Sequence, residues 1–295
     1  RGLGASQWQA MTSEDLVALI GPQWGSLSSV GLTALGTGQW ASIGAEDLRG
    51  LVGAQWEQLG AGTLVALTTT QWQGLASDDL RGLTASQWSV VASDDLQALT
   101  VLQWQSMASD DMKGLVTSQW AAMATDDLVA LSASQWSVVS TEALVALGTA
   151  QWASLASDDL RGLTASQWAS AASDDLNALS ATQWSQLGTD DLRGLGASQW
   201  QAMATEDLRA LGESQWVGLE VAQFAAMASS QWLALSTQNL RYLTANQWGG
   251  VSQETLIVLS TSQWQGLASD DLRGLTASQW SVVATDDLRA MLEAQ

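Results

Sequence analysis

The chain has 295 residues, no cysteine or histidine, 30 acidic against 10 basic residues, and a formal net charge of −20. The lack of cysteine excludes disulfides and thiolate metal sites, and the acidity argues against nucleic acid as a partner, because phosphates bind basic patches. No apolar run approaches the about 18 residues of a membrane-spanning helix, so we expect no membrane insertion.

A Gln-Trp pair recurs every 16 residues, from Gln7-Trp8 to Gln279-Trp280. A fixed period of this kind is typical of a repeat array, which grows by adding units. We predict one uninterrupted array of 18 repeats over residues 1–295, as part of a longer or processed array. The 18 tryptophans all occupy this position, and we predict that they form a structural ladder: Trp8, Trp24, Trp40, Trp56, Trp72, Trp88, Trp104, Trp120, Trp136, Trp152, Trp168, Trp184, Trp200, Trp216, Trp232, Trp248, Trp264 and Trp280.

Each repeat divides into two eight-residue units. Leu stands midway between successive tryptophans, replaced only by Met112 and Phe224, and a second apolar residue follows every Trp and every Leu after three places, with Ala171 as the weak case. An i, i+3 pair lies on one side of a helical turn. Because a continuous helix would rotate this apolar stripe by about 80° in each unit, the helix must end and restart in every unit.

Polar residues supply the expected helix starts. Ser77 precedes Asp78 and Asp79, which is typical of an N-cap followed by acids in the first turn. Thr84 stands three residues before Gln87, as in a capping box. Caps at this spacing predict helices of about six to eight residues.

These features predict an all-α solenoid of very short helices, two per 16-residue repeat. We expect each repeat to form one layer that stacks on the next, with one row of Trp and one row of Leu along the core. A β-solenoid is the alternative, but it requires period-two alternation and β-branched or aromatic strand residues. The observed apolar spacing of three and then five favours helices.

Glutamine precedes tryptophan in all 18 repeats, and glutamate never replaces it. Capping alone would tolerate glutamate. A neutral amide both donates and accepts hydrogen bonds, so it can bond from layer to layer without stacking like charges. We therefore predict a structural glutamine ladder rather than a ligand site.

Charged residues are confined to a few positions. All 10 basic residues directly follow the Leu position, beginning with Arg1 and Arg49, and most acidic residues occupy the two positions before it. The favoured interpretation is a solvated edge of caps and i, i+3 ion pairs, such as Asp78 with Arg81. The alternative is a calcium site, which needs six to eight oxygens and would require acids from two layers.

We predict that the protein is not an enzyme and has no catalytic, cofactor or metal site. The missing histidine and cysteine exclude the common triads, and twelve repeated acid pairs resemble caps rather than one perturbed site. The ends keep the apolar pattern of the array. Head-to-tail assembly through Leu3 and Trp8 at one end and Leu288 and Met291 at the other therefore follows as a hypothesis.

The residue pattern of the eight-residue unit, as in Gln71-Trp72-Gln73-Gly74-Leu75, resembles the tandem S/T-x-Q-apolar-x-x-L repeats of long secreted or surface proteins of Gram-negative bacteria. The resemblance implies an extracellular spacer, adhesin stalk or matrix component. Our functional hypothesis is a rigid acidic rod or self-assembling filament outside the cell. The alternative is a glycan- or aromatic-ligand-binding array, which would need an exposed row of tryptophan rings.

Overall fold

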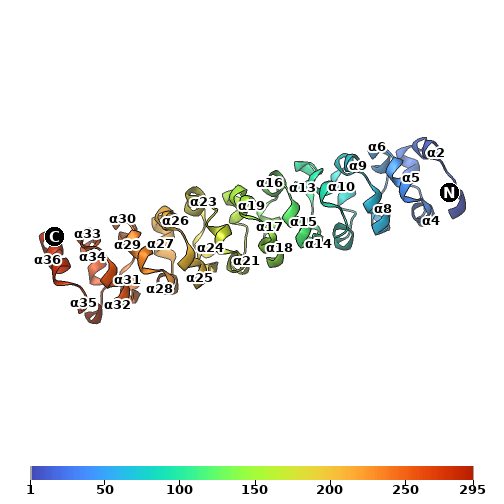
Figure 1. The fold of residues 1–295 in the computed structure, drawn as a ribbon. Coiled ribbons are helices and arrows are strands. Elements are labelled where there is room, and N and C mark those ends of the chain that lie inside the picture. Colours follow the sequence, from blue (N-terminus) through green and yellow to red (C-terminus); the bar gives the residue numbers. More distant parts are fainter. Residues whose placement is uncertain (1, 295) are drawn as a thin grey trace. The chain divides into compact units, whose positions relative to one another are not determined.

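The computed structural model describes the backbone of residues 2–294 and the side-chain surroundings of residues 2–292, so Arg1 of the basic position lies outside the described residues. The described chain forms 36 helices and no strand, which confirms the all-α prediction over the β-solenoid. The residues cluster into two compact units, Arg1–Leu147 and Gly148–Gln295, and the Gln-Trp period runs through the junction without a linker. In each unit the short helices follow one another in a regular coil (Figure 1).

Odd-numbered helices carry the Gln-Trp pair and are called Trp helices here. They are α1 Ala5–Gln9, α3 Gly21–Trp24, α5 Thr37–Ser42, α7 Gly53–Trp56, α9 Thr69–Gly74, α11 Ala85–Trp88, α13 Val101–Ser106, α15 Thr117–Ala122, α17 Ala133–Trp136, α19 Thr149–Ser154, α21 Ala165–Ser170, α23 Ala181–Gln186, α25 Ala197–Ala202, α27 Glu213–Gly218, α29 Ser229–Ala234, α31 Ala245–Gly250, α33 Thr261–Gly266 and α35 Ala277–Trp280.

Even-numbered helices carry the Leu position and are called Leu helices. They are α2 Ser13–Val17, α4 Ser29–Ala34, α6 Ala45–Leu48, α8 Ala61–Ala66, α10 Ser77–Leu80, α12 Ser93–Gln97, α14 Ser109–Gly114, α16 Thr125–Val129, α18 Thr141–Ala146, α20 Ser157–Leu160, α22 Ser173–Leu176, α24 Thr189–Gly194, α26 Thr205–Ala210, α28 Val221–Ala226, α30 Thr237–Arg241, α32 Gln253–Val258, α34 Ser269–Arg273 and α36 Thr285–Ala294.

The helices lie at or below the lower end of the predicted range of about six to eight residues. Before α36, none exceeds six residues, because extended cap residues take up the other positions of the unit. Helix α9, for example, lies between Thr68 (φ −86°, ψ 157°) and Leu75 (φ −64°, ψ 147°). The second apolar residue of each unit is therefore both a core residue and, in the six-residue helices, the point where the chain leaves the helix.

The helix start was predicted correctly in Trp helices and one residue late in Leu helices. Thr84 is the N-cap of α11 and its hydroxyl accepts from Gln87 N. In α10 the N-cap is Ala76, and Ser77 is the first helical residue. Alanine has no capping oxygen, so the Asp79 carboxylate instead accepts from Ala76 N at 2.8 Å.

Within each of the two compact units, the closest helix contacts join helices three positions apart in the chain, such as α11 with α14 and α21 with α24. The expectation of one 16-residue repeat per layer was therefore wrong. Since a step of three changes helix type, every such pair stacks a Trp helix on a Leu helix. Trp and Leu therefore alternate along the stack and do not form the two separate rows that we expected from the sequence.

Small residues permit this close stacking. A Cβ on Gly82 of the α10 terminus would lie 2.9 Å from Gly53 Cα and 2.9 Å from Trp56 Cβ of α7. Real Cβ atoms do not approach backbone this closely, so glycine is required here by space rather than by an unusual backbone conformation.

The core of each unit contains the first and second apolar residues of its helices. The Leu, Met and Phe at the first position and the tryptophans are almost all buried. Phe224 occupies a Leu position, stacks on Trp216 with ring centroids 6.1 Å apart, and lies 6.2 Å from Trp232. The unusual unit at Phe224 thus fills the core with a third aromatic ring.

Candidate functional site

The most regular polar feature is the glutamine of each Trp helix, here called the bridging glutamine. In Gln87 the Oε1 atom accepts from Thr84 N at 2.7 Å, which closes the capping box. Its Nε2 atom donates to the carbonyl oxygens of Trp56 and Leu59, both at 2.8 Å. One buried side chain therefore caps its own helix and binds the end of a helix two repeats earlier.

The same double donation recurs in both units. Glutamine Nε2 donates to the tryptophan carbonyl 31 residues earlier and to the apolar carbonyl 28 residues earlier in Gln39, Gln55, Gln71, Gln87, Gln103, Gln119, Gln135, Gln199, Gln215, Gln231, Gln247, Gln263 and Gln279. The glutamines thus bridge to the main chain rather than to one another.

This geometry explains why glutamate never occupies the position. A carboxylate keeps the acceptor for the N-cap amide but has no donor for the two carbonyl oxygens. It would place a buried charge against two partial negative charges, at a cost of several kcal/mol.

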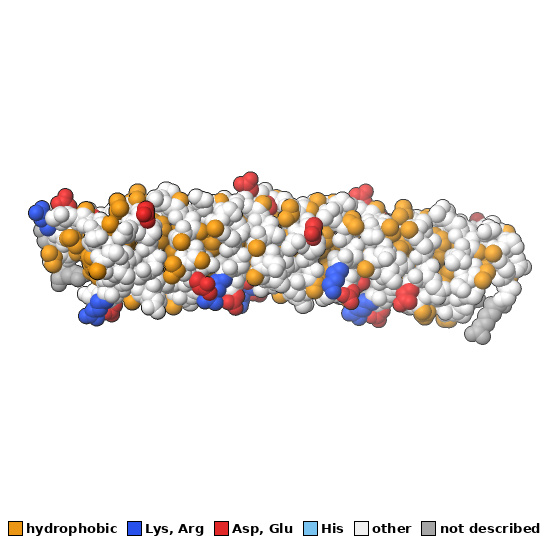
Figure 2. Space-filling view, turned by 90° about the horizontal axis from the view of Figure 1, so that it is seen from below, with side chains coloured by type: hydrophobic (Ala, Val, Ile, Leu, Met, Phe, Trp, Pro, Cys, Tyr) orange, Lys and Arg blue, Asp and Glu red, His pale blue; other side chains and the backbone are white. Residues whose placement is uncertain are grey.

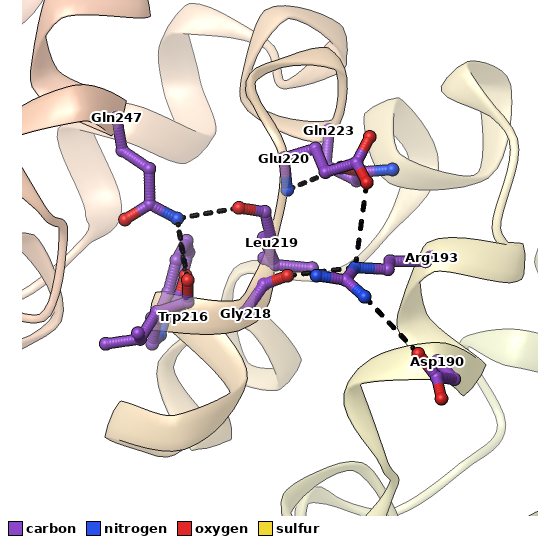
Figure 3. A network of polar contacts seen from close by, with 9 residues as sticks. Asp190, Arg193, Trp216, Gly218, Leu219, Glu220, Gln223 and Gln247 are labelled. Carbon is purple, nitrogen blue, oxygen red and sulfur yellow. Dashed lines mark hydrogen bonds and ion pairs between the residues drawn. The ribbon is translucent and has the colours of Figure 1, made fainter.

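Arginine forms a second bridge at the surface. Figure 3 shows Arg193 of α24, whose Nε donates to Gly218 O at 3.0 Å and whose guanidinium pairs with Asp190 at 3.3 Å and with Glu220 at 3.9 Å. Gln247 binds Trp216 O and Leu219 O on the other side of the same helix end. Arg49, Arg81 and Arg209, which also follow the Leu position, likewise bind the carbonyl 25 residues later at the C-terminal end of a Trp helix.

The tryptophans are core residues. Of the 18, all except Trp280 are buried, and most expose no measurable surface. The indole nitrogens of Trp24 and Trp40 are buried without a hydrogen-bond partner. Those of Trp56 and Trp88 lie near enough to the Asp79 and Asp111 carboxyls to oppose the rise in their pKa, although neither forms a hydrogen bond of full geometry.

In most of the Leu helices that carry two acids, the two have different surroundings. The first is exposed and, where a basic residue stands three places on, can pair with it, as in Asp78–Arg81 at 3.1 Å and Asp110–Lys113 at 2.8 Å. Hydrogen bonding to Lys113 and its charge lower the pKa of Asp110. Such exposed pairs contribute only a few tenths of a kcal/mol. Figure 2 shows these groups of red and blue side chains on the surface.

The second acid is buried in most of the acid pairs, and sequence reasoning missed this difference. Burial, and then repulsion by Asp94, raises the pKa of Asp95 to about 6. Burial also raises the pKa of Asp127, Asp159 and Asp207 to about 6, in each case as the largest cause. The second acid directly precedes the buried leucine, and this position could have indicated its burial, because a side chain there lies close to the stacked helix.

The acid pairs do not gather into a metal site. Over residues 2–292, no three acidic side chains lie close enough to hold a metal ion together. In most pairs one acid faces solvent and the other is buried, so the two do not direct their oxygens to one place as calcium coordination by six to eight oxygens requires.

The predicted assembly residues line two terminal cavities. Leu3 and Trp8 contribute to a cavity of about 200 Å³ with Gln23 and Leu27. Half-buried Leu288 and buried Met291 contribute to an apolar cavity of about 370 Å³, with Leu272, Trp280 and Leu292. Leu292, which sequence reasoning missed, is 82% exposed because α36 continues through the position where other units break.

No described helix is long and apolar enough to cross a membrane. No protein-family model and no curated protein matches the chain. Among solved structures it is similar to a leucine-rich repeat-containing protein, LegL7 from Legionella pneumophila, at 12% identity and a TM-score of 0.17, over 96% of this chain and 94% of that chain.

Proposed function

We propose that the chain is a structural repeat protein, a stiff acidic spacer outside the cell that assembles with copies of itself into filaments. The observation that carries this proposal is the bridging glutamine. Its hydrogen bonds recur with equivalent partners from repeat to repeat in each compact unit. The buried amide groups therefore hold successive turns of the coil together.

Burial of the tryptophans favours this function over the glycan- or aromatic-ligand-binding array. Stacking on a sugar requires an exposed ring face. Since the indole of Trp88 is fully buried, as are most others, these rings contribute to the core and offer no such face. The extracellular location is supported by the resemblance of the octads to secreted and surface repeats.

Self-assembly is supported by hydrogen-bonding groups near the two terminal cavities. Gln23 accepts from Ile20 N at 2.9 Å, but its Nε2 has no acceptor among the described residues. The carbonyls of Trp280 and Val283 belong to residues three places apart, as do the carbonyls of Trp56 and Leu59 that Gln87 binds. A second copy that brought these carbonyls to Gln23 would repeat the internal bridge across the contact.

The test is electron microscopy and analytical ultracentrifugation of the 295-residue chain over a concentration series. We expect fibres or larger species that grow with concentration. Leu292→Glu should suppress them, because it places a charge in the apolar cavity while the exposed side chain tolerates the change. Leu288→Glu with Met291→Glu should act more strongly.

Leu102→Glu is the matched control, since Leu102 is also exposed but lies in α13, away from both cavities. Equal assembly of the Leu292→Glu and Leu102→Glu proteins would contradict the proposed end-to-end contact. A monomer at every concentration would contradict self-assembly but would leave the spacer function standing.

A further inference from the structure

The buried acids of the Leu helices fall into two classes according to the residue that faces them from the preceding stack. Asp79 and Asp111 face Arg49 and Arg81, 30 residues earlier, and each arginine lowers the pKa of its carboxyl against the larger raising effect of burial. Arg81 is held in place by Ser106 O at 3.1 Å.

At other buried acids a neutral residue takes the arginine's position. Gln97 Nε2 donates to Ala122 O at 2.5 Å, and Asn177 Nδ2 donates to Ala202 O at 3.3 Å, so each amide makes the same bridge without its charge. The acids 30 residues later are Asp127 and Asp207. For Asp95 the corresponding residue is the exposed Val65.

The remaining surroundings supply no cation to the first of these acids. Asp95 lies in α12, which packs against α9 and α15, and neither carries a charged residue. Its charged neighbour is Asp94 of its own helix, whose repulsion adds to the effect of burial.

Asp127 and Asp207 are in the same situation. Asp127 lies in α16 and packs against the uncharged α13, with Asp126 as its charged neighbour. Asp207 lies in α26, between the uncharged α23 and α29; Glu206 raises its pKa, and Arg209 is the basic residue of its own helix. The N-cap amide of Ala124 and the Trp104 indole oppose the rise in the pKa of Asp127, but its Oδ2 atom has no hydrogen-bond partner. Asp207 lacks the capping bond that Asp79 accepts from its N-cap amide.

We propose that Asp95, Asp127 and Asp207 form an acid-responsive set, which takes up protons on mild acidification and thereby tightens the stacking of helices within each unit. The residue after the Leu position acts as the selector: arginine opposes proton uptake by the acid 30 residues later, whereas Val65, Gln97 and Asn177 bring no charge to oppose it.

The direction of the effect follows from linkage. The pKa of each carboxyl in the folded chain, about 6, exceeds the ordinary value of 3.8. The folded state therefore binds the proton more tightly, and the resulting stability is fully present below the ordinary pKa and is lost as pH rises through about 6.

The experiment combines carboxyl ¹³C NMR titration of the full chain with urea unfolding at about pH 5 and about pH 7.5, on either side of the folded value. We expect the three carboxyls to titrate near pH 6, and the urea midpoint to be higher in acid. The proposal is overturned if these carboxyls titrate at the ordinary value of 3.8.

The selector is tested by combining Val65→Arg, Gln97→Arg and Asn177→Arg. These positions lie at the surface, and Arg49, Arg81 and Arg193 show that the fold accepts arginine there. The three titrations should move to lower pH and the two urea midpoints should draw together. Unmoved titrations would overturn the role of the selector.

Two further variants keep the test independent of folding defects. Among the buried acids, Arg81→Gln should raise the titration midpoint of Asp111, because the charge is lost while glutamine can keep the bridge to Ser106 O. Asp95→Asn, Asp127→Asn and Asp207→Asn together should reduce the difference between the urea midpoints, leaving the part that comes from Asp159, whose pKa burial also raises to about 6. The fold tolerates asparagine there, as Asn239 shows at the equivalent buried position. An undiminished difference in this protein would assign the effect to other groups.

Discussion

The side-chain nitrogen of Gln87 lies 2.8 Å from the carbonyl oxygen of Leu59, 28 residues earlier in the chain. Leu59 is the last apolar residue of its unit, where the chain leaves the helix and main-chain carbonyls lose their intrahelical donors. The glutamine replaces those donors. Very short helices leave many main-chain N–H and C=O groups at their ends without partners, and this bond supplies a donor to one of them.

Gln87→Glu should destabilise the protein by about 3–5 kcal/mol, because it removes both donated hydrogen bonds and buries a carboxylate beside two carbonyl oxygens. Urea unfolding followed by circular dichroism measures the loss. The control is Gln58→Glu, the same substitution at an exposed glutamine that bonds only within its own unit, and it should change stability by less than about 0.5 kcal/mol.

Gly82→Ala should destabilise the chain by about 1–3 kcal/mol through overpacking, despite the better helix propensity of alanine. The new methyl group would meet the backbone of Gly53, which cannot move aside as a flexible side chain can. Gly62→Ala is the matched control: nothing lies within 4 Å of its added Cβ, and we expect a gain of about 0.4–1 kcal/mol. Equal effects would contradict the close stacking of α10 on α7.

Tryptophan emission should be blue-shifted and protected from acrylamide, because all the rings except that of Trp280 are buried. Trp280→Phe should remove most of the fraction that acrylamide quenches. By comparison, Trp88→Phe should leave that fraction unchanged. Strong quenching in the Trp280→Phe protein would indicate exposed rings and revive the ligand-binding alternative.

Asp95→Asn should stabilise the chain at neutral pH by about 1–3 kcal/mol, since a pKa raised to about 6 means that the folded state disfavours the carboxylate. The gain should shrink as pH falls through about 6, where Asp95 itself becomes protonated. Thermal unfolding across this pH range tests both expectations. Asp94→Asn, at the neighbouring exposed acid, should give a smaller gain, because it removes the repulsion between the two acids but leaves the Asp95 carboxyl buried.

Much of the candidate site could be predicted from repetition alone. The 16-residue period assigned a structural role to each Gln-Trp pair, and burial of Trp88 and the capping box of Gln87 agree with it. The acceptors of Gln87 could not be predicted, because they lie 28 and 31 residues away and the sequence contains no signal for which helices meet. The burial of Asp95 beside the exposed Asp94 was missed for the same reason.

The sequence by itself determined that the chain is helical, where each helix breaks, and which positions face the core, because periodicity and caps act within one or two turns. Only the tertiary structure decided that helices stack three apart, so that Trp helices lie on Leu helices and Arg81 faces Asp111. That choice depends on the angle between successive helices and on how closely positions such as Gly82 and Gly53 approach. Both are properties of packing between distant residues, which a local pattern cannot specify.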